Sequence, residues 1–377
     1  MNAGKEGPAA VEYDMIFVGT SMICVLEAVF QSLSGKSVLM LDRQSGIGGA
    51  WRSLELFGLH DVENAIHYFL PDPLAFEFMR NVLKWNVTTD LRKYRIFPLP
   101  VRGCWKVPYD NAFGRMISVI KEGVIHGRKL SLFAIVLNAF IDFLFKSRPP
   151  SYYVEGGTPE MLRKVDLILR ASDVEVRYST SIDRIYIDSG AEVVEITVGE
   201  ERIFAKTIFF THGSRISNLT GNSGAFQIDE KLHLRPAAHL LVNDSSPSKM
   251  YECIFTADPL IKYVHDVTRN LRESKELVGR KKLFVFALQP GVRESDTVYQ
   301  AIFEKLKSVG LVGKNASLDG QYWQNIYLPR LDDSDLEKLK VAFGAQVEYL
   351  KTEDFARGIG LNAEKWATKI RFPAALK

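Results

Sequence analysis

Two short apolar runs enclose a helical pattern near the N-terminus. Residues 15–18 (MIFV) and 38–41 (VLML) are continuously apolar, and residues 22–33 between them carry apolar side chains at helical spacing. Runs of this length indicate strands buried on both faces of a parallel sheet. Gly19 ends the first run and supplies a turn. The pattern predicts a strand–helix–strand unit over residues 13–42.

The chemistry at the ends of this unit is that of a dinucleotide site. Gly19 makes a turn that a side chain would obstruct, and the following helix offers free N–H groups to a diphosphate. Asp42 ends the second strand twenty-three positions after Gly19 and can accept hydrogen bonds from ribose hydroxyls. Ser21 and Cys24 stand where the usual glycine pattern has its second and third glycines. The alternative is a Rossmann-like unit that only contributes to the core.

The pattern resumes after the linker at residues 147–151. Gly156 and Gly157 allow a tight turn, and Thr158 followed by Pro159 predicts a helix start with the threonine as its cap. The strand pattern that follows, over residues 174–210, predicts a β-meander that returns to the first sheet.

Beyond Arg215 the pattern changes to strands broken by turn residues. An amphipathic helix is predicted over residues 295–310, a strand over 322–329 and a helix over 334–343. These elements predict a second domain built on a mixed sheet.

Composition narrows the class of protein. The chain has 377 residues, 46% of them hydrophobic, so it can bury a large core, and a formal charge of +3 gives no reason to expect nucleic acid as a partner. Three cysteines without a CxxC pair favour a reducing compartment. The N-terminal residues have no apolar signal-peptide core, and no apolar run reaches the length of a membrane span. We therefore expect a cytoplasmic protein.

Two segments suggest partners without identifying them. Basic residues gather between Arg92 and Lys106, including Arg95 and Arg102, and could hold an anionic or nucleotide-linked substrate; a solvated strand face is the alternative. Residues 129–146 form a strongly apolar helical pattern. We favour its packing against neighbouring elements over contact with a membrane surface, because few basic residues flank it.

A third group lies on a predicted strand. His233, Arg235 and His239 share one face at strand spacing. Arg235 is the candidate anchor for a substrate anion, and a salt-bridged arginine is the alternative. We expect no metal site, because no cysteine lies nearby and Glu230 falls on the other face.

The residues after Asp42 carry a resemblance to a known class. Arg43 and the loop Gly46–Trp51 resemble the passage that follows the ribose-binding acid in flavoproteins with two dinucleotide-binding motifs. Within that class the chain resembles the UDP-galactopyranose mutases, the amine-oxidase and protoporphyrinogen-oxidase group, and the Rab GDP-dissociation inhibitors. The Gly-Gly, helix and meander pattern after residue 151 extends the resemblance.

The resemblance implies an α/β fold with a Rossmann-like FAD/NAD(P)-binding domain of the GR2 type and a second, mixed-sheet substrate domain. The first domain would comprise residues 12–60, 150–215 and 330–377, and the second would comprise residues 61–149 and 216–329. FAD is the implied cofactor. The implied cofactor-binding residues are Gly19, Ser21, Asp42, Arg43, Gly48, Gly49, Trp51, Ile182 and Gly358, and His67 is the implied neighbour of the flavin ring.

Three functions remain open. The first is an FAD-dependent oxidoreductase of the amine-oxidase type that acts on a small molecule, with His67 and Arg235 as candidate catalytic residues. The second is a mutase-like flavoenzyme that acts on a nucleotide sugar and needs arginines to hold the diphosphate. The third is a non-catalytic carrier on the GDP-dissociation-inhibitor scaffold, which the altered third glycine and the passage around Gly358 would suit. We favour the first.

Overall fold

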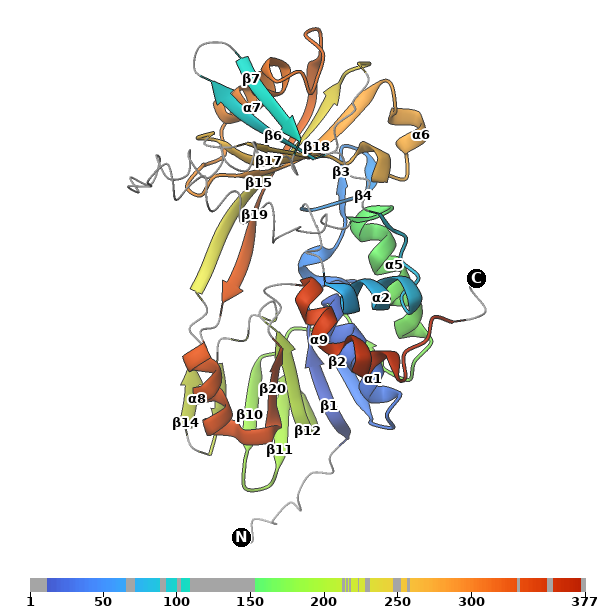
Figure 1. Ribbon diagram of the computed structural model, residues 1–377. Helices are drawn as coiled ribbons and strands as arrows, with labels where there is room; N and C mark the ends of the chain where they lie inside the picture. Colours follow the sequence, from blue (N-terminus) through green and yellow to red (C-terminus); the bar gives the residue numbers. More distant parts are fainter. Residues whose placement is uncertain are drawn as a thin grey trace, which may run out of the picture.

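The chain forms two domains, each built on a large sheet (Figure 1). In the computed structural model the residues described are 12–65, 72–88, 93–99, 103–108, 153–211, 214, 216, 218–222, 224–227, 231–246, 252–255, 258–330, 333–350 and 355–373. The predicted helix at 129–146 and His67 lie outside these residues.

The first sheet has a parallel centre, as the apolar runs predict. Within the described part of the chain, its parallel neighbours are, in order, β20 (Val347–Leu350), β12 (Glu201–Thr211), β1 (Tyr13–Val18), β2 (Val38–Leu41) and β9 (Glu175–Arg177). The N-terminal half of β12 also begins an antiparallel meander with β11 (Val193–Val198) and β10 (Arg184–Asp188). The predicted return of the meander to the first sheet is therefore confirmed.

Two more strands extend this sheet. β13 (Asn218–Gly221) pairs with β10, and β14 (Gly224–Gln227) pairs with β13. The domain boundary predicted at residue 215 therefore falls before two strands that belong to the first sheet. The reason is that β13 finds its hydrogen-bonding partner in the meander's free edge, which a local pattern does not reveal.

Helices cover one face of the first sheet. Apolar side chains of α1 (Met22–Ser32), α2 (Pro73–Asn81), α5 (Gly157–Arg170) and α9 (Phe355–Ala367) pack together with those of β1 and β2. α1 and α9 are also joined by Glu27, which accepts hydrogen bonds from Lys365 Nζ and Trp366 Nε1, each at 2.7 Å. On the opposite face lie α8 (Asp333–Phe343) and the one-turn helix η4 (Gly344–Gln346).

The second sheet lies above the first in Figure 1. Its described strands run in the order β19 (Ser317–Arg330), β15 (Lys231–Asn243), β18 (Lys281–Leu288), β17 (Ile261–Asp266), β16 (Glu252–Phe255), β6 (Lys93–Leu99) and β7 (Gly103–Pro108). α7 (Asp296–Ser308), capped by Ser295, packs on one face as its apolar stripe predicts. β18 pairs with β15 only from Ala237 onward, so the start of β15 and the end of β19 form a two-stranded ribbon that reaches down toward the first domain (Figure 1).

Short elements fill the space between the two sheets. The hairpin β3 (Leu54–Leu56) and β4 (Leu59–Val62) packs on the other face of the second sheet with η3 (Thr268–Asn270) and α6 (Ser274–Leu277). β5 (Val87–Thr88) pairs with β8 (Tyr153–Val154), and η1 (Gly49–Trp51) follows β2. Segments from both domains therefore meet between the sheets.

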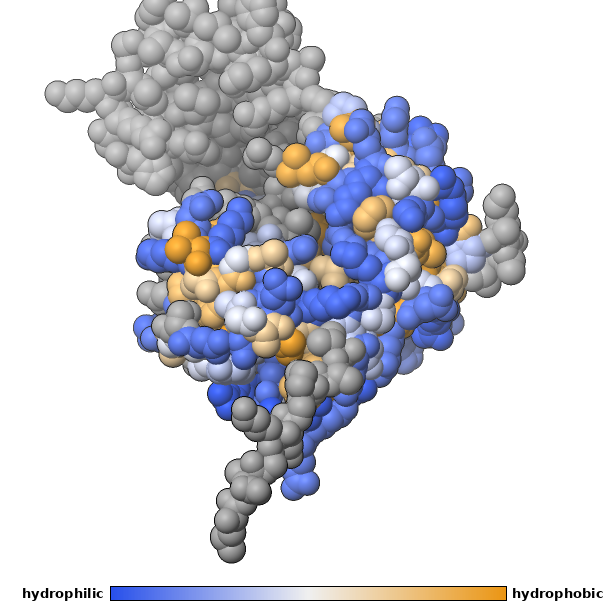
Figure 2. Space-filling view, turned by 90° about the horizontal axis from the view of Figure 1, so that it is seen from below, coloured by the Kyte–Doolittle hydropathy of each residue, from blue (hydrophilic) through white to orange (hydrophobic). Residues whose placement is uncertain are grey.

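The lower face of the first domain is mostly hydrophilic (Figure 2). Among the described residues, the most exposed large apolar side chains are Val341 on α8 and Leu361 on α9, at 86% and 76%. Single apolar residues of this kind are ordinary on a protein surface. Among the described residues, no helix is both long enough and apolar enough to cross a membrane.

Candidate functional site

A tight turn joins β1 to α1, as the opening pattern predicts. Gly19 has φ +95°, a conformation that glycine adopts without strain, and its N–H donates to Leu41 O at 2.8 Å. Ser21 caps α1, with its hydroxyl accepting from Cys24 N at 3.4 Å. Cys24 itself is fully buried, and burial raises the pKa of its thiol to about 12. At the third glycine position the cysteine therefore serves as a small apolar group.

Asp42 lies against this turn. Its Oδ2 accepts from Thr20 N at 2.7 Å and from Thr20 Oγ1 at 2.6 Å, and its Oδ1 accepts from Gln44 N at 2.8 Å. The residue is only 6% exposed. A carboxylate has about four acceptor positions, so one position on Oδ1 remains for a ribose hydroxyl. That role stays a prediction, and the observed role is to hold the turn.

The Gly48–Gly49 loop closes over the same turn. Gly48 N donates to Thr20 O at 2.9 Å, and a Cβ atom added to Gly49 would lie 3.7 Å from Ser21 N. Gly48 has φ +114°, and a Cβ atom there would lie 2.8 Å from both methyl groups of Leu162 on α5. Glycine is required at Gly48 by conformation and by space together.

These residues fit the diphosphate of a dinucleotide. The first N–H groups of α1 have no acceptor within the helix, and the helix dipole favours negative charge at this end. Gly19 is half-buried, and the nearest atom to a Cβ added there is Ser214 Oγ at 3.6 Å, so the turn presents backbone rather than side chain. Among the predicted cofactor residues, the structure thus brings together Gly19, Ser21, Asp42, Gly48 and Gly49.

The remaining predicted cofactor residues are dispersed. Trp51 ends η1 and packs half-buried on the helical core, Arg43 is exposed beside Asp42, and Ile182 packs on the opposite core just before β10. Gly358, which the resemblance places in a passage leading into the last helix, lies in the first turn of α9, which begins at Phe355. Its carbonyl accepts from Asn362 Nδ2. The local glycines do not break α9, because the helix is held by its packing on α1 and α2.

Arg235 is exposed and lies on the two-stranded ribbon. By strand alternation it shares the face of His239, which is turned toward the first domain. This agrees with the expected common face, although the side chain of His233 is not described. The structure therefore places Arg235 beside the space between the domains, and its role as an anion anchor stays a prediction.

A second cluster, which we call the Glu63 junction, joins the two domains. Glu63 follows β4, and its Oε1 accepts from Tyr153 Oη of β8 and from Thr158 N of α5, each at 2.8 Å. His239 of β15 donates from Nε2 to the Glu63 carbonyl at 2.8 Å. Asn64 donates from Nδ2 to Ala50 O beside the glycine loop. One short segment thus contacts the glycine loop, α5 and the second sheet.

Burial sets the electrostatics of the Glu63 junction. Glu63 is 1% exposed, and burial raises the pKa of its carboxyl to about 7, against the lowering effect of the bonds from Tyr153 and Thr158. Burial lowers the pKa of His239 to about 4, so this imidazole is neutral at pH 7. Burial likewise raises the pKa of Tyr153 well above its ordinary value, and the nearby carboxylate adds to the effect.

Sequence reasoning missed Glu63, and it chose the wrong cap for α5. The helix begins at Gly157 after Gly156, and no side chain of its own caps it. The capping acceptor is Glu63, ninety-five residues earlier than Thr158. A Cβ atom on Gly157 would lie 1.7 Å from Glu63 Oε1, so the glycine pair serves the approach of this carboxylate. The only local signal in the sequence was the glycine pair Gly156–Gly157 at the start of a helix that lacks a side-chain cap.

Comparison with known proteins identifies the fold. No family model matches the chain, and no curated protein matches it. Among solved structures, a protein from Exiguobacterium sp. 255-15, provisionally named a protoporphyrinogen oxidase, is similar at 10% identity with a TM-score of 0.62, over 93% of this chain and 98% of that one. Putrescine oxidase bound to putrescine is 12% identical with a TM-score of 0.62, over 94% and 99% of the two chains.

A fatty acid isomerase from P. acnes is also similar, at 11% identity with a TM-score of 0.59, over 96% of this chain and 99% of that one. Identities this low establish architecture and leave chemistry open. The predicted fold class is confirmed: the chain has a mixed α/β architecture with a second, mixed sheet, and it shares this overall fold with these solved structures.

Proposed function

We propose that the chain binds FAD along the Gly19–Ser21 turn and acts as an FAD-dependent oxidoreductase of the amine-oxidase type on a small-molecule substrate. The observation that carries this proposal is the closure of the Gly48–Gly49 loop on the turn, with Gly48 N and Asp42 both bound to Thr20. These residues of one strand–helix–strand unit and the loop after it make one backbone-lined site at the end of the parallel strands, where nucleotides bind in such sheets.

In such an enzyme the flavin accepts a hydride, and the protein supplies orientation and electrostatics. The described residues suit that division of work. Gly19, Ser21 and the start of α1 would hold the diphosphate, and Asp42 would hold the adenosine ribose. Arg235, on the face turned toward the first domain, would attract an anionic substrate from the ribbon.

The first test is whether the purified chain carries flavin. We expect absorbance in the flavin bands and release of FAD on denaturation. A variant with Gly19→Val should lose the flavin, because a branched side chain at φ +95° cannot keep the turn. Gly199→Val is the matched control, since Gly199 has φ +58° in a hairpin with no atom within 4 Å of an added Cβ. A colourless wild-type chain that does not take up added FAD would reject the proposal.

The non-catalytic carrier is the second candidate, and one observation favours it. Asp42 already receives three hydrogen bonds from the protein, so the turn is stable without a ribose. Failure to bind FAD would support this candidate. The mutase alternative needs arginines for the diphosphate, and its candidates are Arg95, Arg102 and Arg235. Only the side chain of Arg235 lies in the described part of the structure. Isomerisation of a nucleotide sugar by the reduced, flavin-loaded chain would support this alternative over the oxidoreductase.

A further inference from the structure

The two oxygen atoms of Glu63 have unequal surroundings. Oε1 accepts two hydrogen bonds, from Tyr153 Oη and Thr158 N. Oε2 is buried and receives none from the described residues. An ionised carboxylate would leave this oxygen as an uncompensated buried acceptor, which is costly. A neutral carboxylic acid fits better, since its carbonyl oxygen accepts two bonds while the other oxygen carries the proton.

The described groups around Glu63 supply no balancing positive charge. The titratable groups that face it are Tyr153 of β8 and His239 of β15, with His265 of β17 edge-on to the Tyr153 ring at 5.5 Å. On α5, Glu160 is paired with Arg163 and Lys164. His239 donates to a carbonyl and is neutral, so its Nδ1 is an acceptor without a partner among the described residues. Among the described residues, the Glu63 junction therefore offers no donor to Oε2 and no cation.

The same segment holds three elements together. Asn64 bonds the glycine loop at Ala50 O, and Gln324 of β19 bonds the Asn64 carbonyl. Tyr153 also accepts from Asn270 of η3. A change at Glu63 would therefore be felt by α5, by the loop that closes on the Gly19–Ser21 turn, and by the second sheet. Since α5 also meets Gly48 through Leu162, the path from Glu63 to the turn is short.

We propose that Glu63 is a positioning residue: in its neutral form it holds α5, the Gly48–Trp51 loop and the second sheet in the arrangement that binds the cofactor, and ionisation loosens that arrangement. The cofactor part of this inference rests on the proposed function. A pKa of about 7 for this carboxyl places the transition within the range accessible to experiment.

The experiment measures the dissociation constant of FAD by flavin fluorescence at pH 5.5 and pH 8.5, and urea unfolding of the FAD-free chain at both values. We expect wild-type affinity to fall about tenfold or more at the higher pH, as stability falls. Glu63→Gln keeps the shape and the two accepted bonds but cannot ionise, so its affinity and stability should not fall at the higher pH. The lowered pKa of His239 should instead add some stability as pH rises in wild type and variant alike. Wild-type pH dependence retained in Glu63→Gln would overturn the inference.

Two further variants guard the result. Glu27→Gln changes a buried carboxylate whose two oxygens are both bonded by donors, so it should leave the pH dependence intact. If Glu63→Gln does not fold, Tyr153→Phe provides the test. Removing this donor to Oε1 should raise the pKa of Glu63 and move the midpoint of the pH-dependent loss of stability to higher pH. An unchanged midpoint would contradict the inference. If the wild-type chain binds no FAD, the proposed function fails alone, and the unfolding profiles still decide the role of Glu63.

Discussion

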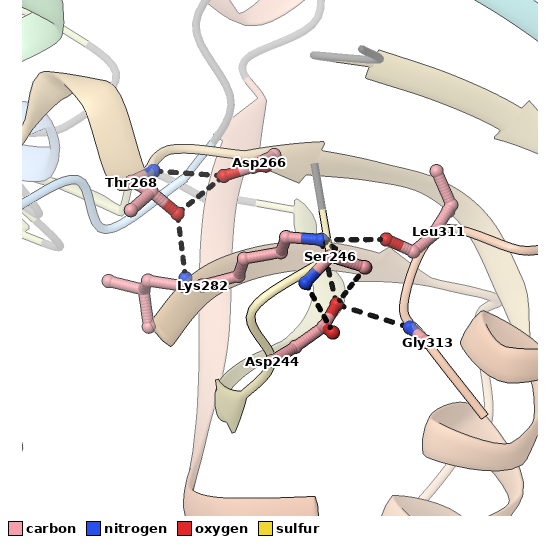
Figure 3. Close-up of polar contacts among 8 residues, drawn as sticks. Asp244, Ser246, Asp266, Thr268, Lys282, Leu311 and Gly313 are labelled. Atoms are coloured by element: carbon pink, nitrogen blue, oxygen red, sulfur yellow. Dashed lines mark hydrogen bonds and ion pairs between the residues drawn. The ribbon is translucent and has the colours of Figure 1, made fainter. Parts of the chain in front are cut away.

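Two buried carboxyl groups of this chain are held in opposite ways. Asp244, in the second domain, faces Lys282 Nζ at 2.7 Å and also accepts from Ser246 and from Gly313 N (Figure 3). The lysine in turn bonds Ser246 Oγ and Leu311 O. Glu63, between the domains, has two neutral donors on one oxygen and, within the described part of the chain, none on the other. The first cluster is complete as a structural unit, and the second is not.

The difference teaches where to look for function. A buried charge that is paired and fully bonded mainly fixes local structure. A buried carboxyl with an unpaired oxygen keeps its ability to gain or lose a proton under mild conditions, and such groups concentrate at functional sites. The positions of the two groups agree with this distinction. Asp244 links the loop at Gly313 to β18 within the second domain, whereas Glu63 contacts elements of both domains.

The largest expected effect on stability comes from disrupting the Asp244 cluster. Lys282→Ala leaves Asp244 buried without its cation and should lower the free energy of unfolding by about 3–5 kcal/mol. The neighbouring Lys281 pairs with Asp319 at the surface, and Lys281→Ala should cost less than about 1 kcal/mol. Urea unfolding of both variants checks the contrast. Similar losses in the two variants would mean that the buried pair has no special weight.

Gly157→Ala should come next, at about 2–4 kcal/mol, because it combines positive φ with a Cβ atom that overlaps the Glu63 carboxylate. Gly35→Ala is the matched control. Gly35 has φ +87° but no atom within 4 Å of an added Cβ, so only the conformational cost remains, about 1–2 kcal/mol. Thermal or urea unfolding of both gives the difference, and equal costs would contradict the close approach of Glu63.

The pH dependence of stability should have opposite signs at the two carboxyl groups. The raised pKa of Glu63 contributes stability that is fully present below about pH 4.5 and is lost as pH rises through about 7. Each unit of pKa difference between the folded and unfolded states corresponds to about 1.4 kcal/mol, so the loss is roughly 3 kcal/mol. Burial alone would raise the pKa of Asp244, but Lys282 and the Ser246 and Gly313 donors lower it. Its contribution is therefore present above its ordinary pKa and lost as pH falls.

Comparing urea unfolding of wild type, Glu63→Gln and Asp244→Asn from pH 4 to pH 8 separates the two contributions. Glu63→Gln should remove the fall in stability toward neutral pH, and Asp244→Asn should remove part of the fall toward acid. A wild-type profile that rises steadily from pH 5 to pH 8 and is unaltered by Glu63→Gln would break the comparison.

The smallest effect concerns the cofactor rather than stability. Asp42→Ala should weaken FAD binding by roughly 1.5–3 kcal/mol, the range for hydrogen bonds to a charged group, because it removes the predicted ribose acceptor and frees Thr20. Asp14→Ala, at the opposite end of β1, should leave binding unchanged. Titration calorimetry with FAD measures both, and unchanged affinity in Asp42→Ala would remove the adenosine end from our assignment.

Much of the first domain followed from the sequence alone. The apolar runs at 15–18 and 38–41 could be read directly, because strands buried on both faces need no polar alternation. The helix predicted to start at Ser295 and the apolar face of α7 could also be predicted from the sequence. Gly19, Ser21, Asp42 and the Gly48–Gly49 loop were found because the turn chemistry of a strand–helix–strand unit is local in the chain.

Other features depended on residues that only folding brings together. The resemblance placed Gly358 in a passage leading into the last helix, and packing on α1 and α2 decides that Gly358 belongs to the first turn of that helix, α9. The sequence pattern assigned Thr158 as a cap, whereas the capping oxygen arrives from Glu63, and it gave no sign that this acid would be buried. Local patterns determined the strands, the turn and the fold class, since these depend on near neighbours. The tertiary structure alone decided the charge and partners of Glu63, because burial and hydrogen bonds across the two domains set its proton affinity.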